Sequence, residues 1–147
     1  MKVSLFTLFT SLALTSMVHA ADTSAIAASV PMVQSYAVQP VHKFNEKLAV
    51  ATAEKADWAT SPESISKQYV GQGFTMISSQ QRNGSVITYN LRPSSDQHPQ
   101  LLMILSLNKR KHGWQLNKAG LSWRCQNDAF YGTNNCATRA QQAPTHR

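Results

Sequence analysis

Acidic residues are scarce in this chain of 147 residues, which has seven Asp and Glu against fourteen Lys and Arg. So few carboxylates leave few pairs for general acid and base catalysis. The sequence also lacks a glycine-rich phosphate loop and a serine nucleophile motif. Its five histidines show no spacing typical of a metal site or a catalytic base: His19, His42, His98, His112 and His146. We therefore expect a non-enzymatic protein with no catalytic residues, no metal, no cofactor and no small-molecule substrate.

The first twenty residues are typical of a cleavable export signal. Lys2 supplies a positive start, residues 3–17 form a short run of apolar and hydroxyl side chains, and Val18-His19-Ala20 ends the run with a small residue. We expect cleavage after Ala20 and a periplasmic or secreted protein with no stable membrane insertion. The alternative is an uncleaved anchor, although the apolar run is short for a membrane span.

Cysteine is almost absent, since only Cys125 and Cys136 occur. Two cysteines cannot supply the four ligands of a closed zinc site, and no HxxxH pair accompanies them. In an oxidising compartment they are expected to form one disulfide. Closing this short loop stabilises the fold by about 2–3 kcal/mol in the chain-entropy model.

Positive charge is concentrated in the second half of the chain. From Trp58 to the C-terminus the acidic residues are Glu63, Asp96 and Asp128. The basic residues of the same stretch are Lys67, Arg82, Arg92, Lys109, Arg110, Lys111, Lys118, Arg124, Arg139 and Arg147. Such a surface favours nucleic acid or another anionic polymer as a partner. The alternative is a charge that serves solubility alone.

Composition divides the mature chain into three parts. Residues 21–40 are rich in Ala, Ser, Thr and Val, contain two prolines and predict a flexible N-terminal arm. Residues 41–136 have the periodicity of a single α+β domain. Residues 137–147 are Gln-rich without apolar spacing, so they predict a disordered tail.

Within residues 41–136, apolar spacing changes from helical to strand-like. Residues 41–58 predict one long amphipathic helix, and Ser61-Pro62 predicts the start of a short second helical turn. Residues 74–81 and 85–91 flank Asn83-Gly84, a dipeptide typical of a tight hairpin. Residues 100–107 predict a central strand, and residues 114–116 and 121–125 the last strand or two. The fold expected is α+β, with one long N-terminal amphipathic helix packed on a four-stranded antiparallel β-meander.

This order of elements resembles the globular headpiece of the type IVa pilins over residues 41–136. The matching features are Tyr69-Val70 before the first strand, the hairpin strand with residues 86–89, the strand over residues 101–107, and Trp123-Arg124-Cys125. In that family a disulfide loop comes after the final strand, and here Cys136 stands where it would close. The resemblance implies a pilin-headpiece-like fold with a C-terminal disulfide loop, and a role in pilus-associated assembly or adhesion.

The N-terminus departs from the pilin pattern. A prepilin has a basic leader ending in Gly and a long apolar helix with Glu at the fifth mature position. Here the apolar segment ends at Ala20, and Pro31 and Pro40 interrupt the next twenty residues. The resemblance therefore implies a soluble relative of the headpiece, with an envelope or pilus protein as its partner, and not a filament subunit.

Two sets of residues are candidates for binding. The first is a basic cluster near an aromatic side chain, suited to a phosphate backbone and its bases: Lys109, Arg110, Lys111, His112, Lys118 and Arg124. Its alternative role is a solvated turn that protects an edge strand. The second is Phe130 with Tyr131, which we expect the disulfide loop to hold outward for a protein contact.

Overall fold

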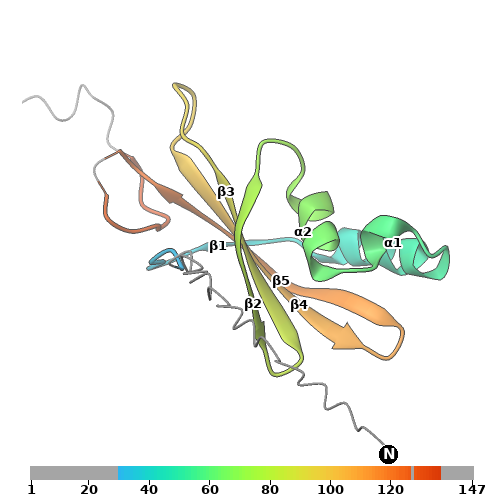
Figure 1. The fold of residues 1–147 in the computed structure, drawn as a ribbon. Helices are drawn as coiled ribbons and strands as arrows, with labels where there is room; N and C mark the ends of the chain where they lie inside the picture. Colours follow the sequence, from blue (N-terminus) through green and yellow to red (C-terminus); the bar gives the residue numbers. More distant parts are fainter. Residues whose placement is uncertain (1–29, 127, 137–147) are drawn as a thin grey trace, which may run out of the picture.

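The computed structural model describes residues 30–126 and 128–136. The expected signal and the expected C-terminal tail lie outside these residues. The elements in chain order are β1 (Ala37–Gln39), α1 (His42–Ala53), the 3-10 helix η1 (Asp57–Ala59), α2 (Pro62–Val70), β2 (Thr75–Arg82), β3 (Ser85–Arg92), β4 (Gln100–Arg110) and β5 (Gly113–Arg124). The strands form one antiparallel sheet in the order β1-β5-β4-β3-β2, with α1 and α2 on one side of it (Figure 1).

The expected fold class is wrong in two respects. The sheet has five strands, because β1 from the segment expected to be an arm pairs with β5. The long helix expected over residues 41–58 is replaced by the twelve-residue helix α1 and the short 3-10 helix η1, while the second helical turn expected at Ser61-Pro62 is the nine-residue helix α2. The long helix that the pilin comparison required is therefore absent from the described part of the chain, and no described helix is long and apolar enough to span a membrane.

Helix α1 ends early because the backbone turns after Ala53. Lys55 has a positive φ of 57°, a conformation that no helix interior accommodates. Trp58, which the periodicity placed on the same helix, instead comes from η1 and still reaches the core. Its ring lies 6.0 Å from the ring of Phe44 on α1. The apolar spacing therefore identified a core residue correctly but assigned it to the wrong element.

Helix α2 begins as its sequence predicts. Ser61 caps it, since its side-chain oxygen accepts from the backbone N–H of Ser64, and Pro62 occupies the first turn. The helix buries Ser66 against the sheet, where the Ser66 hydroxyl lies 2.6 Å from that of Thr88. The Asn90 amide donates to both hydroxyls. This satisfied polar cluster fixes α2 over β3, because any other position would leave buried polar groups unpaired.

The β2–β3 hairpin is confirmed at Asn83-Gly84. Both residues have positive φ, 44° and 78°, as a two-residue hairpin turn requires. The final hairpin is longer than expected, since the polar residues 108–110 continue β4 and residues 113–124 form a single strand β5. Its turn therefore projects beyond the apolar part of the sheet.

The core lies between the helices and one face of the sheet. Its buried residues are Leu48, Ala51, Ala59, Ile65, Leu105, Leu107, Leu116 and Ala119. Because strand side chains alternate between faces, residues 105 and 107 define the helix-covered face of β4, and residues 104 and 106 lie on the other. None of the described helices lies on that second face (Figure 1).

Candidate anion-binding surface

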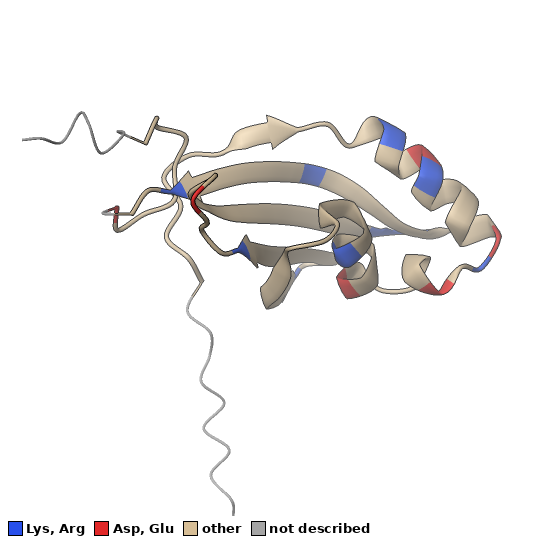
Figure 2. Cartoon of the chain, turned by 90° about the horizontal axis from the view of Figure 1, so that it is seen from above, with Lys and Arg blue, Asp and Glu red and all other residues tan. Residues whose placement is uncertain are grey.

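Charge is divided between the strands and the helices. The five strands contain no Asp or Glu, and their basic residues are Arg82, Arg92, Lys109, Arg110, Lys118 and Arg124. On or beside the helices, acidic and basic residues balance: Glu46, Glu54, Asp57 and Glu63 with Lys43, Lys47, Lys55 and Lys67. Figure 2 shows the same division, with red on the helical segments and two loops and only blue on the strands. The positive field of the described part of the chain therefore belongs to the sheet.

The β4–β5 turn carries the densest group of positive charges. Lys109 and Arg110 end β4, and Lys111 and His112 form the turn itself, all four exposed. The Lys109 ammonium lies 4.8 Å from the centre of the Trp114 ring, a cation–π distance. The Arg110 Nε donates to the Gln115 side chain at 3.1 Å. These contacts hold two of the cations in place while their remaining donors stay available to a ligand.

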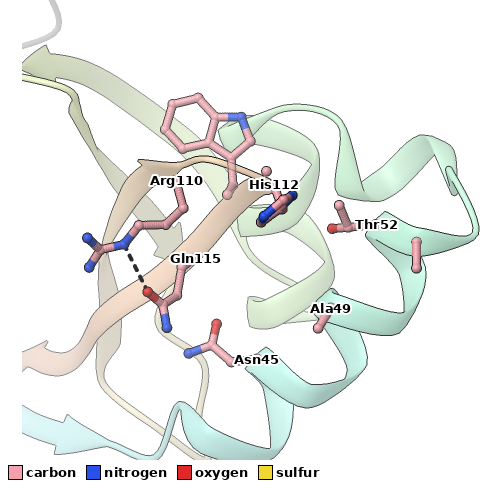
Figure 3. Close-up of a pocket in the computed structure, with 9 residues that line it drawn as sticks. Asn45, Ala49, Thr52, Arg110, His112 and Gln115 are labelled. Atoms are coloured by element: carbon pink, nitrogen blue, oxygen red, sulfur yellow. Dashed lines mark hydrogen bonds between the residues drawn. The ribbon is translucent and has the colours of Figure 1, made fainter.

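A groove of about 560 Å³ separates this turn from α1 (Figure 3). Its lining combines polar side chains of the helix with basic and aromatic side chains of the hairpin: Asn45, Ala49, Thr52, Ala53, Arg110, His112, Gly113, Trp114 and Gln115. None of the described residues that line it carries a carboxylate. The groove can therefore accept an anionic or aromatic group, and its described lining has no acidic side chain that would bind a cation.

Two contacts fix the walls of the groove. The Asn45 side chain on α1 donates to the Leu116 carbonyl at 2.8 Å and accepts from the Leu116 N–H at 3.0 Å. The hairpin also approaches α1 closely, because a Cβ built on Gly113 would lie 2.9 Å from the Thr52 methyl group. Gly113 has φ of 139°, which side-chain-bearing residues rarely adopt. The groove is therefore a product of the packing of α1 on β5.

The structure does not bring the whole predicted basic cluster together. Lys118 lies in the middle of β5, opposite Ser106 of β4. Arg124 ends β5, roughly 35 Å along the strand from the turn at about 3.3 Å per residue. Its guanidinium lies 5.1 Å from the centre of the Tyr131 ring. The cluster is therefore one compact group at residues 109–112 and two separate cations farther along the sheet.

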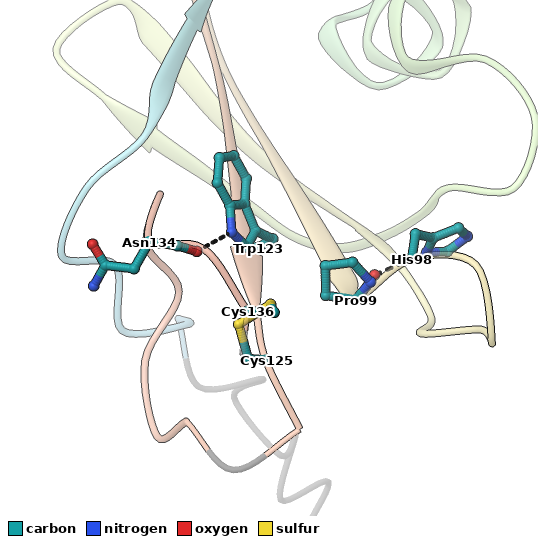
Figure 4. The surroundings of a disulfide bond; sticks show 6 residues. All are labelled: His98, Pro99, Trp123, Cys125, Asn134 and Cys136. Carbon is teal, nitrogen blue, oxygen red and sulfur yellow. Dashed lines mark hydrogen bonds between the residues drawn. A yellow bond between two sulfur atoms is a disulfide. The ribbon is translucent and has the colours of Figure 1, made fainter. Parts of the chain in front are cut away.

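The predicted disulfide between Cys125 and Cys136 is confirmed, and it closes a loop at the far end of β5 (Figure 4). The loop returns to the sheet, since Gly132 pairs with Trp123 and the Trp123 indole donates to the Asn134 carbonyl at 2.6 Å. The disulfide is compatible with a periplasmic or extracellular protein.

The two aromatic residues of this loop differ in exposure. Phe130 is 39% exposed. Tyr131 is 5% exposed, and its hydroxyl donates to the Gln100 side chain at 2.6 Å. Burial raises the pKa of the Tyr131 hydroxyl above its ordinary value, and the charge of Arg124 lowers it in part. Tyr131 therefore supports the loop from inside, which leaves Phe130 as the candidate contact.

Metal-ligating side chains do not gather in the described part of the chain. It contains no group of three or more His, Cys, Asp and Glu side chains that could hold a metal ion. His42 forms an exposed pair with Glu46 at 3.2 Å, one helical turn away. The polar residues of the groove that the sequence patterns did not identify are Asn45, Thr52 and Gln115. No local pattern identifies Asn45, because its partner Leu116 lies 71 residues away in the chain.

Comparison with protein-family models, with curated proteins and with solved structures found no match to this chain. The pilin resemblance thus depends on sequence pattern alone. Function must be inferred from the surface itself.

Proposed function

We propose that this protein is an exported, non-enzymatic binder of anionic polymers, and that the turn formed by residues 109–112 is its primary contact. The observation that carries the proposal is the charge division, because a sheet with basic residues and no acidic ones attracts a polyanion over its whole length. All four residues of the turn are exposed. The groove beside it offers the Trp114 ring and further donors to the same ligand.

Salt dependence tests the proposal directly. Each phosphate neutralised by a Lys or Arg contributes about 0.7–0.9 to the slope of log K against log salt concentration. Binding of a fluorescein-labelled polyphosphate, followed by anisotropy, should therefore weaken steeply between roughly 50 and 200 mM salt. The Lys109→Ala, Arg110→Ala, Lys111→Ala triple variant should lose two or more units of that slope.

The matched control removes three lysines from the helices. The Lys43→Ala, Lys47→Ala, Lys67→Ala variant has the same net charge as the turn variant, and all three lysines are exposed. It should retain most of the affinity if the turn is the contact. If both variants weaken binding equally, only the net charge of the protein matters and the turn is not the contact. If the affinity does not change with salt concentration, the proposal that the protein binds an anionic polymer is wrong.

A second function, contact with an envelope or pilus protein through the disulfide loop, is favoured by the exposure of Phe130. An aromatic side chain held outward by a closed loop offers contact area at a low cost in conformational entropy. In pull-downs from an envelope extract, Phe130→Ala should then lose a partner that the triple turn variant keeps. The opposite pattern assigns the interaction to the turn.

A further inference from the structure

The sheet face that the helices leave free carries a row of apolar side chains at its centre. Pairing in register places Ser78, Tyr89, Ile104 and Gly120 side by side across β2, β3, β4 and β5 on this face. The place of a side chain at Gly120 is taken by Tyr36, because a Cβ built there would lie 2.6 Å from the Tyr36 ring. Tyr89, Ile104 and Tyr36 therefore form one row.

Both tyrosines of this row are at least partly exposed. Tyr36 is 50% exposed, and Tyr89 is partly exposed in the middle of the sheet. Neighbouring strands lie about 4.8 Å apart, so the rings on β3 and over β5 are separated by roughly 10 Å, with Ile104 between them. A row of this kind is a platform on which planar groups can stack.

The same face is positively charged toward the β4–β5 turn. The next row across the sheet is Gln80, Ile87, Ser106 and Lys118, and the row after it contains Arg82, Ser85, Asn108 and Gln115. Arg110 lies beside Gln115, to which it is hydrogen-bonded. Lys118, Arg82 and Arg110 therefore lie one, two and three rows from the aromatic row, all in the direction of the turn. No acidic residue lies on any of the strands.

The opposite end of the face is closed by the disulfide loop. Tyr131 is buried there against Arg124 and Gln100, which face each other across β5 and β4. The accessible platform therefore runs from the tyrosine row to the basic turn, and the turn proposed as the primary contact is its outer end.

We propose that this face binds single-stranded nucleic acid, with bases stacked on Tyr89 and Tyr36 and phosphates beside Lys118, Arg82 and Arg110. The inference rests on the proposed binding of an anionic polymer and extends it by naming the class of polymer. Single-stranded nucleic acid is the polyanion that also presents unpaired aromatic planes, and it is bound elsewhere by aromatic platforms in positive grooves. A duplex hides its base faces, and an acidic peptide would leave the tyrosine row without a partner.

Two probes with the same backbone separate the role of the bases from that of the phosphates. The first is a labelled oligothymidylate of about 15 nucleotides, and the second is an abasic deoxyribose-phosphate oligomer of equal length. Both should bind with strong salt dependence. The oligothymidylate should bind about 5- to 150-fold more tightly for each base stacked, because stacking of one base contributes that factor.

Substitutions on the face should then act selectively. Tyr89→Leu and Tyr36→Leu keep apolar volume but remove the aromatic plane, so each should weaken oligothymidylate binding at least about fivefold and leave the abasic probe unchanged. Phe130→Leu, an exposed aromatic outside the face, is the matched control and should change neither. The Arg82→Ala, Lys118→Ala variant should weaken both probes and lower the salt slope by about 1.4 units.

The outcomes distinguish this inference from the proposed function. If wild-type protein binds both probes and polyphosphate equally, the protein recognises phosphate alone and the nucleic-acid inference is wrong while the proposed function stands. Equal affinity for a duplex, or for polyglutamate, also overturns the inference. If none of the polyanions binds, both proposals fail. The wild-type comparison of the two probes decides the matter even if a tyrosine variant does not fold.

Discussion

Replacement of Asn45 tests whether the side chain on α1 substitutes for a missing strand. β1 pairs only with residues 119–121 of β5, so the edge of β5 nearer the turn lacks a strand partner. The Asn45 amide fills this gap by exchanging two hydrogen bonds with the buried Leu116. Asn45→Ala removes both and leaves a backbone donor and acceptor unpaired. The expected loss in the free energy of unfolding is about 2–4 kcal/mol, at roughly 1–2 kcal/mol per group.

The Asn45→Asp substitution should make the stability of the protein depend on pH through this position. The introduced carboxylate accepts from the Leu116 N–H but cannot donate to the Leu116 carbonyl, so only its protonated form restores both bonds. The pKa of this carboxyl is therefore higher in the folded state than in the unfolded state. The stability recovered by protonation is fully present below the unfolded-state pKa and is lost as the pH rises through the folded-state pKa. At neutral pH this variant should lose about half as much stability as Asn45→Ala, because one of the two bonds remains, and it should recover the rest in mild acid.

Urea unfolding followed by tryptophan fluorescence gives the free energies, and amide hydrogen exchange at Leu116 gives the local effect. Asn117→Ala is the matched control, because Asn117 is exposed on the same strand. A loss below about 0.5 kcal/mol for Asn45→Ala, with unchanged protection of the Leu116 amide, would refute the role of Asn45 as a strand substitute.

Three further predictions concern the loop, the β1 edge and high pH. Cys125→Ser with Cys136→Ser, or reduction of the wild type, should lower the free energy of urea unfolding by about 3 kcal/mol. Gly120→Ala should lower the free energy of unfolding by about 1–3 kcal/mol, because the added Cβ meets the Tyr36 ring. In the Tyr36→Ala background the same substitution should cost less, and strictly additive effects in the double-mutant cycle would contradict the contact. Burial raises the pKa of the Tyr69 hydroxyl, so the free energy of unfolding should fall as the pH rises above about 10. The Tyr69→Phe variant should lose less stability over this range, and an equal decline in the wild type and the variant would disprove the contribution of Tyr69.

Local signals predicted the local features of this fold. Ser61-Pro62 and Asn83-Gly84 specify a helix start and a hairpin turn through their own side chains and backbone preferences, so neighbouring sequence is sufficient. The disulfide was predictable because the chain has one possible pair of cysteines. Each of these inferences needs information from only a few residues.

The fifth strand could not be predicted because its largest apolar side chains, those of Tyr36 and Val38, lie on the exposed side of the strand segment. In the extended segment that includes β1, burial alternates over residues 31–39: the exposed residues are Met32, Gln34, Tyr36 and Val38, and the half-buried ones are Pro31, Val33, Ser35, Ala37 and Gln39. An amphipathicity rule assigns the apolar side to the core and so misreads this segment. Val38, 79% exposed, pairs in register with Gly120, a residue that lies far from it in the chain.

The candidate site was predicted in part for a similar reason. The basic residues 109–112 are contiguous, so their grouping is evident from the sequence. The groove wall from α1 and the tyrosine row depend on pairings between distant strands, such as Tyr89 with Ile104 and Ile104 with Gly120. Register decides which side chains share a face, and a shift by one residue would have moved every one of them to the other side.

A β-bridge joins Val33 to Tyr131, so both ends of the described part of the chain lie at the disulfide end of the sheet and away from the basic turn. An affinity tag or biotin placed upstream of Val30 or downstream of Cys136 would anchor the molecule by the same pole. Biosensor experiments could therefore use either attachment and still present residues 109–112 to the solution, so that agreement between the two geometries becomes an internal check on any measured affinity.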